Sequence, residues 1–172
     1  MRGLSRVIDK IVSWQAEGSG HLMTLLAVLM CVEVILRYVF KTPTVWGLEF
    51  TTFLFGMHFL LGYSYTELHH GHVNVTIFTL FLPKKVQAYL YLISTSIISL
   101  PLCTLLALWG WDNAMESTRT LERSPSAWNP PIWPMKLIMA IGFTLLAMQV
   151  LSNIIKAFAA LSEEKTELGE VR

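Results

Sequence analysis

The chain has 172 residues, of which 53% are hydrophobic and 15% are charged, and its formal net charge is +1. The apolar residues form long blocks and the basic residues are dispersed, which is typical of a membrane protein and excludes a nucleic-acid-binding surface. Because crossing the hydrocarbon core takes about 20 helical residues, a chain of this length has room for four crossings and not for a separate soluble catalytic domain.

The first segment, residues 4–16, is predicted to be a short amphipathic helix in the membrane interface. Its apolar residues recur at helical spacing and most of its polar residues fall on other faces; the apolar set is Leu4, Val7, Ile8, Ile11 and Trp14. An ordinary solvated lead-in is the alternative. The sequence EGSG, Glu17 to Gly20, is expected to end this segment.

Four longer apolar runs then predict an all-α membrane protein with four transmembrane helices and this interfacial helix. The predicted spans are residues 21–40, 45–68, 86–111 and 132–161, followed by a charged cytoplasmic tail at 162–172. Residues 1–172 are expected to form a single membrane domain.

The connections between these runs are short or mixed in polarity. KTPT joins the first two spans, and its Pro43 predicts a tight helical hairpin. The stretch HHGHVNVTIFTLFLPKK, residues 69–85, is too short in its apolar part to cross and is expected to be an interfacial loop or a half-buried helix. Pro101 should kink the third span.

The orientation follows from the distribution of basic residues. With the N-terminus in the cytoplasm, eight basic residues face the cytoplasm and five face outward, so the positive-inside rule favours two cytoplasmic termini. Five of the six tryptophans fall at the outer ends of the predicted spans, as in an interfacial aromatic belt; they are Trp46, Trp109, Trp111, Trp128 and Trp133.

Three charged residues interrupt the first hairpin, although a charge at bilayer depth costs ~2.5 to 3.5 kcal/mol. The hairpin places Arg37 and Glu49 at similar depth, and Glu33 lies one helical turn from Arg37. The Arg37 guanidinium can therefore serve both carboxylates. Three roles stay open: a snorkelling arginine with a locally paired glutamate, a polar contact with a partner subunit, and ion translocation.

The histidines and cysteines give weak signals. A membrane haem needs two histidines on facing helices at matching depth, and His21 and His58 are expected at different depths. The cluster HHGH lacks supporting cysteines or carboxylates, and both Cys31 and Cys103 are expected to be buried thiols. No catalytic or nucleotide-binding motif is present, so neither an enzyme nor a bound cofactor is predicted.

Taken together, the motifs resemble the small membrane subunit of tripartite ATP-independent periplasmic (TRAP) transporters. The order is RYVF, a short loop, W-x-x-E, FLLGYSY, HHGHVNV, a Pro-Lys loop and a Pro-rich entry to the last span. This resemblance covers about Leu4 to Leu161. It places the family's motif positions on Arg37, Trp46, Glu49, Gly62, His72 and Val73, whereas the acidic residue that often follows the His-Val pair is replaced here by Asn74, Val75 and Thr76.

The resemblance also implies partners and a place in the cell. It implies a multi-pass protein of the bacterial inner membrane with both termini cytoplasmic, bound to a large multi-span subunit that carries the substrate and sodium sites. A periplasmic binding protein would deliver an organic acid, and sialic acids and C4-dicarboxylates both stay open. Membrane lipid is the remaining expected partner.

Two other functions compete with this one. A four-helix proton-coupled multidrug exporter could use Glu33 as its proton and cation site, although Arg37 one turn away would hold the carboxylate ionised. A membrane anchor of a redox enzyme would instead hold haem between its helices, which a Soret band in the purified protein would reveal.

Overall fold

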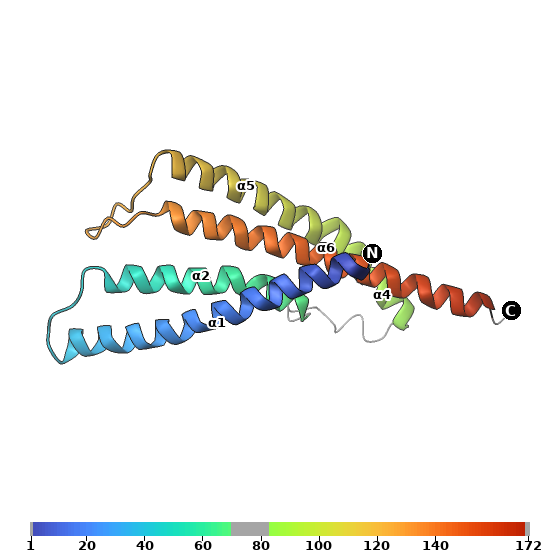
Figure 1. Ribbon diagram of the computed structural model, residues 1–172, viewed down its shortest axis with the longest axis horizontal. Coiled ribbons are helices and arrows are strands. Elements are labelled where there is room, and N and C mark those ends of the chain that lie inside the picture. Colours follow the sequence, from blue (N-terminus) through green and yellow to red (C-terminus); the bar gives the residue numbers. More distant parts are fainter. Residues whose placement is uncertain (1, 70–82, 171–172) are drawn as a thin grey trace.

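The computed structural model describes residues 2–69 and 83–170, and within these ranges the fold is all-α, as predicted. In chain order the elements are α1 (Arg2–Tyr38), α2 (Gly47–Leu68), α4 (Lys84–Ser94), the π-helix η1 (Thr95–Ser99), α5 (Leu100–Arg119) and α6 (Trp133–Glu170) (Figure 1). Because α4, η1 and α5 follow one another without a gap, they form one long helix.

The helices form two antiparallel hairpins, α1 with α2 and α5 with α6 (Figure 1). The hairpins meet mainly through α2 and α6, the inner part of α1 also packs against α6, and α5 lies on the outside. The two chain ends lie at the same end of the molecule, here called the inner end, and the loops 39–46 and 120–132 lie at the opposite, outer end.

Helix α1 is continuous through the predicted break at Glu17 to Gly20, so the expectation of a separate helix ending there is wrong. From Ser5 to Glu33, buried residues of α1 recur every seven positions and form a seam along the helix, with Ile8 buried beside them; the repeating residues are Ser5, Val12, Ser19, Leu26 and Glu33. A seven-residue repeat keeps one helix face against its neighbours. Burial of Ser19 carries this seam through the Gly-containing segment, and tertiary packing therefore overrides the weak helix propensity of glycine.

The third predicted span also extends beyond its predicted end, because α5 continues to Arg119 rather than stopping at residue 111. The expected irregularity is present: the π-helix Thr95–Ser99 lies just before Pro101, and the chain changes direction between α5 and α4 (Figure 1). As a consequence, Trp111 does not lie at the helix end. Its indole Nε1 donates to Thr144 Oγ1 at 3.0 Å and joins α5 to α6.

Helix α6 likewise continues to Glu170, so most of the predicted tail at 162–172 is helical. The glutamate-rich sequence after Leu161 has high helix propensity, and an existing helix extends without a new nucleation step. The predicted span 132–161 is therefore part of a longer helix, in which Trp133–Ala159 is the part apolar enough to cross a membrane.

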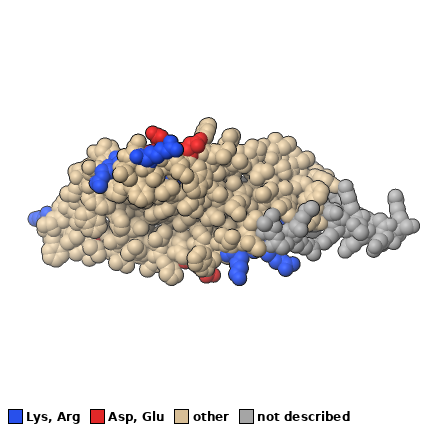
Figure 2. Space-filling view, turned by 45° about the horizontal axis from the view of Figure 1, so that its top comes forward, with Lys and Arg blue, Asp and Glu red and all other residues tan. Residues whose placement is uncertain are grey.

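In the described part of the chain, three helical segments are long and apolar enough to cross a membrane, namely Ser5–Tyr38, Val86–Arg119 and Trp133–Ala159. In each of them at most a third of the apolar window is buried by the rest of the chain. Figure 2 shows this exposed apolar surface: a broad area without Lys, Arg, Asp or Glu, with a few charged groups at its edges. Cys103 is buried as expected, whereas Cys31 is exposed on this apolar surface, contrary to expectation.

Candidate functional site

The site predicted from the sequence centres on Glu33, which lies on the buried seam of α1 near the outer end. Arg37 Nη2 donates to Glu33 Oε1 at 3.0 Å, which confirms the predicted pair one helical turn apart. The hydroxyl of Thr44 donates to the second oxygen, Oε2, at 2.5 Å. Both carboxylate oxygens are therefore engaged, an arrangement that satisfies a charged group in an apolar setting.

Thr44 also positions the start of α2. Its Oγ1 accepts the backbone N–H of Gly47 at 3.0 Å while its hydroxyl donates to Glu33. A Cβ added to Gly47 would overlap Thr44 Oγ1 and the Glu33 carboxylate, so the two helices approach here through a residue without a side chain. The sequence signal for this role was a threonine just ahead of a predicted helix, the position where a hydroxyl caps free N–H groups.

The predicted ion pair between Arg37 and Glu49 is wrong. Glu49 Oε2 instead accepts the hydroxyl of Ser126 at 2.5 Å, in the outer loop of the other hairpin. Helical geometry gives the reason: Gly47 faces Glu33, and Glu49 is two residues further on, about 200° around α2. Similar depth alone therefore did not bring Arg37 and Glu49 together.

An aromatic cluster accompanies the Glu49 contact and ties the two hairpins at the outer end. Phe50 lies between Trp46 and Trp128, with ring centroids 6.1 Å from each and edge-to-face orientations. Such pairs stabilise by about 0.5–1.5 kcal/mol each beyond their buried area. Trp46 thus belongs to the contact between loop 39–46, α2 and loop 120–132.

Gly62, another of the predicted site residues, does not belong to this cluster. Gly62 lies well away from it on α2, where an added Cβ would meet open space, and it lines a pocket of about 570 Å³ with His58, Tyr65 and His69. His72 falls outside the residues that the structure describes.

The histidines of the haem hypothesis lie at similar depth, so the argument from mismatched depth is wrong. His58 Nδ1 lies 3.0 Å from the Ser19 carbonyl oxygen, and His21 is only two residues beyond Ser19. Two residues correspond to about 200° of helix rotation, so His21 lies on the opposite side of α1 and is exposed. The two rings consequently do not face each other across a haem-sized site.

A polar network at the inner end, which was not predicted from the sequence, joins α1 to α6. Asp9 on α1 pairs with Lys156 on α6, with Oδ2 and Nζ 2.7 Å apart. Gln149 Nε2 and the Ser152 hydroxyl also donate to Asp9 Oδ1, at 3.1 and 3.2 Å. One carboxylate therefore receives three side chains from a single face of α6.

The same face of α6 also binds α2. Asn153 Nδ2 donates to the backbone oxygen and to the carboxylate of Glu67, both at 3.0 Å. Gln149, Ser152, Asn153 and Lys156 are spaced i, i+3, i+4 and i+7, and the first three are buried. A polar stripe of this period inside an apolar run was a readable signal, because polar groups in a span face other protein groups.

The contacts of these side chains hold helices together. Among the described residues, no three His, Cys, Asp or Glu side chains are grouped so that they could hold a metal ion. Glu33, engaged by Arg37 and Thr44, is not free to exchange a proton for a cationic drug as an exporter would require.

Comparison with known proteins identifies a family that matches most of this chain. Residues 26–160 match the family described as tripartite ATP-independent periplasmic transporters, DctQ component. A curated relative from Vibrio cholerae serotype O1, the C4-dicarboxylate TRAP transporter small permease protein DctQ, is 29% identical over 90 residues. That stretch is 52% of this chain and 38% of the relative, so the match spans well under half of the relative's length.

Proposed function

This chain belongs to the family of DctQ components of tripartite ATP-independent periplasmic transporters, and we propose that it works as the rigid scaffold of a sodium-coupled organic acid importer. Members of this family are transporter components and not enzymes. It is accordingly a small permease subunit of a TRAP transporter, as the sequence resemblance predicted. The scaffold role, the coupling ion and the substrate are the proposal.

Four membrane crossings support this role. Three segments meet the length and apolarity needed to cross, and α2 has 22 residues, enough for ~33 Å of helix. Its polar residues Glu49, His58 and Ser64 lower its mean hydropathy, but each bonds to another part of the chain. We therefore propose that α2 is the fourth span, shielded between α1 and α6.

Both termini would face the cytoplasm, because α1 and α6 place them at one end and the basic residues favour that side. Fusion of green fluorescent protein to the C-terminus should give fluorescent cells, and fusion of alkaline phosphatase there should give inactive enzyme. The opposite pair of results would contradict this orientation.

The sparse burial of the membrane-capable helices is the observation that carries the partner proposal. At most a third of each apolar window is covered by the chain itself, so most of that surface is left for lipid and for another membrane protein. A large multi-span subunit would cover part of it and would carry the substrate and sodium sites. The hydrogen bonds that close both ends of the hairpins would give that subunit a rigid surface to move against.

Co-expression with a large TRAP membrane subunit from the same organism tests this proposal. We expect a tag on this chain to retain the large subunit through affinity purification and size-exclusion chromatography in detergent. Arg37→Ala should weaken that complex or the fold, because Glu33 would lose its cationic partner. Recovery of the tagged chain alone, with the large subunit folded in the same membranes, would contradict the assignment.

The substrate class is proposed from the family and from the printed name of the relative, which concerns a C4-dicarboxylate transporter. We propose that a periplasmic binding protein delivers an organic acid to the complex. Proteoliposomes holding both membrane subunits should take up the acid only with the binding protein and an inward sodium gradient. Uptake by this chain alone would contradict a purely supporting role.

A further inference from the structure

The inner part of α1 exposes large apolar side chains that the described chain does not cover. Val7, Ile11 and Trp14 are 56%, 44% and 77% exposed, whereas Ile8 between them is buried on the seam. The residues predicted to form one apolar face therefore lie on two different sides of α1. One side packs against the bundle, and the other forms an outward apolar stripe.

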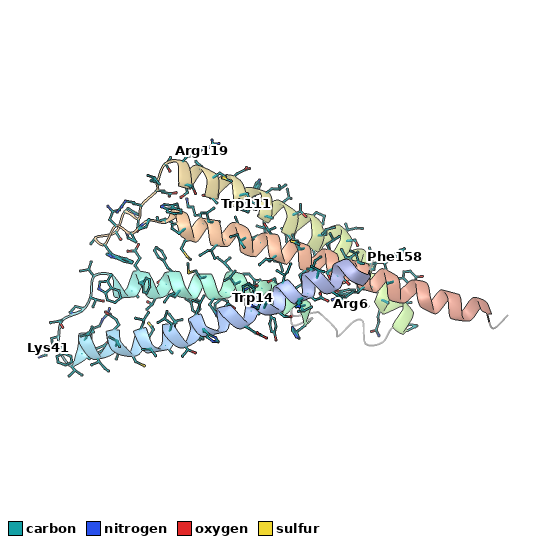
Figure 3. The ribbon with its side chains drawn as sticks, viewed as in Figure 1. Arg6, Trp14, Lys41, Trp111, Arg119 and Phe158 are labelled. Atoms are coloured by element: carbon teal, nitrogen blue, oxygen red, sulfur yellow. The ribbon has the colours of Figure 1, made fainter. Side chains whose placement is uncertain are left out.

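Two cations border this stripe. Measured from Ser5 on the seam, a rotation of about 100° per residue places Arg6 at ~100°, Lys10 at ~140° and Trp14 at ~180° around the helix. Arg6 and Lys10 are exposed, and in the described part of the chain no carboxylate forms an ion pair with either. Figure 3 shows Arg6 nearer than Trp14 to the end that carries both termini.

The length of α1 places these cations beyond the hydrocarbon, on the inner side of the membrane. The segment Ser5–Tyr38 has 34 residues and is therefore ~51 Å long, against ~30 Å of hydrocarbon. With its outer end at the outer interface, about 20 Å of helix continues past the hydrocarbon on the inner side. Arg6 and Lys10 lie in that part, and Trp14 lies between them and the hydrocarbon, ~6 Å from its boundary.

A groove continues from Trp14 toward the membrane centre. A pocket of about 590 Å³ between α1 and α2 is lined by Trp14, Gly18, Leu22 and Leu61, together with polar residues. A Cβ added to Gly18 would meet nothing within 4 Å, so this part of the groove is open. Glu17 also lines it, but it lies seven residues, ~10 Å, from Lys10 and leaves the cations free for an anion.

We propose that this surface binds one anionic phospholipid of the inner leaflet, with its phosphate at Arg6 and Lys10 and an acyl chain in the groove past Trp14 and Gly18. Charge complementarity selects an anionic headgroup, because a cation near the membrane surface favours anionic lipid. The tryptophan ring lies between headgroup and chain, where its amphipathic character fits. The inference rests on the proposed insertion with cytoplasmic termini.

Native mass spectrometry of the purified full-length protein, titrated in detergent with dioleoylphosphatidylglycerol or dioleoylphosphatidylcholine, tests the site. We expect the wild-type protein to retain phosphatidylglycerol preferentially. Arg6→Gln/Lys10→Gln should reduce that preference by about tenfold to thirtyfold. Lys41→Gln/Arg119→Gln removes two exposed cations from the outer end (Figure 3) and should leave it unchanged.

A second variant examines the groove without changing the cations. Gly18→Leu fills the open space and should lower retention of phosphatidylglycerol, with unchanged helicity by circular dichroism. Equal retention of both lipids by the wild type, or an unchanged preference in Arg6→Gln/Lys10→Gln, would overturn the site.

The same titration distinguishes a lipid-binding site from a surface that contacts the large subunit. If the complex with the large subunit loses the lipid preference that the free chain shows, the stripe is a protein interface and the lipid proposal is wrong. Co-purification of the large subunit is scored independently, so failure of the lipid site leaves the proposed function standing.

Discussion

At the scale of single residues, Glu33 shows how a carboxylate is accommodated in an apolar helix. Its two oxygens are satisfied by Arg37 on the same helix and by Thr44 from the following loop. An uncompensated charge at this depth would cost several kcal/mol, and the charge-assisted hydrogen bonds offset that cost. The carboxylate therefore links α1 to the start of α2 through hydrogen bonds.

Thr44→Val should destabilise the protein by about 1–3 kcal/mol, because one oxygen of Glu33 and the N–H of Gly47 would both lose their partner. Thermal unfolding in detergent measures the loss as a lower Tm. Thr44→Ser keeps the hydroxyl and should stay close to the wild type. Equal Tm values for Thr44→Val and the wild type would show that solvent replaces these bonds.

Gly47→Ala should cost about 1–3 kcal/mol, since the added methyl group overlaps the Glu33 carboxylate and Thr44 Oγ1. Gly20→Ala is the matched control, because its added methyl group meets nothing within 4 Å. There the better helix propensity of alanine should raise stability slightly. The two variants are compared by Tm, and a similar change in both would contradict close packing at Gly47.

At the scale of elements, a salt bridge closes the turn between α5 and α6. Lys136 Nζ lies 2.5 Å from Glu122 Oε2, and this hydrogen bond is the main reason that the pKa of Glu122 is lowered from its ordinary value of 4.5. A lowered pKa means that the folded state favours the carboxylate. The contribution to stability is therefore present above pH ~4.5 and is lost as the pH falls through the lowered pKa.

Glu122→Gln should lower Tm at pH 7, and the difference from the wild type should shrink as the pH falls below ~4.5. The effect should be small and should weaken in high salt, because Glu122 is near the surface. Glu116→Gln removes a nearby exposed carboxylate that forms no salt bridge in the described chain and should change Tm little. A pH-independent difference for Glu122→Gln would contradict the ionic account.

Packing between elements explains the errors in the predicted helix boundaries. The glycines in EGSG suggested a break because local propensity was the available signal, but the seam through Ser19 packs against neighbouring helices that are distant in sequence. The polar residues DNAMESTR suggested a loop after Trp111, although they extend α5 beyond the apolar run. Hydropathy marks where a helix can meet lipid, not where the helix ends.

At the scale of the whole molecule, the sequence was enough for the all-α fold, the first hairpin and the Glu33–Arg37 pair, because these depend on composition and on spacing within one helix. Contacts between the hairpins could not be derived that way. Glu49 binds Ser126, 77 positions away, and Asp9 binds Lys156, 147 positions away. Such pairs depend on which helix faces meet, which hydropathy and spacing leave undetermined.

The junction of the two hairpins depends on close approach of α2 and α6. A Cβ on Gly142 of α6 would lie 2.9 Å from the backbone oxygen of Leu60 on α2, which is too close for a side chain. Gly142→Ala should therefore push the hairpins apart and lower stability by about 1–3 kcal/mol, measured as Tm in detergent.

Gly62→Ala is the control for this prediction because it lies on α2 only two residues from Leu60, yet its added methyl group meets open space. It should leave Tm unchanged or slightly raised, since alanine favours the helix. Equal losses in both variants would show that α2 is sensitive to any added bulk rather than joined to α6 at Gly142. Gly62→Ala can also be tested for retention of the large subunit. If the variant keeps its Tm but no longer retains that subunit, Gly62 contacts the partner. This motif position would then serve the complex and not the fold of the isolated chain.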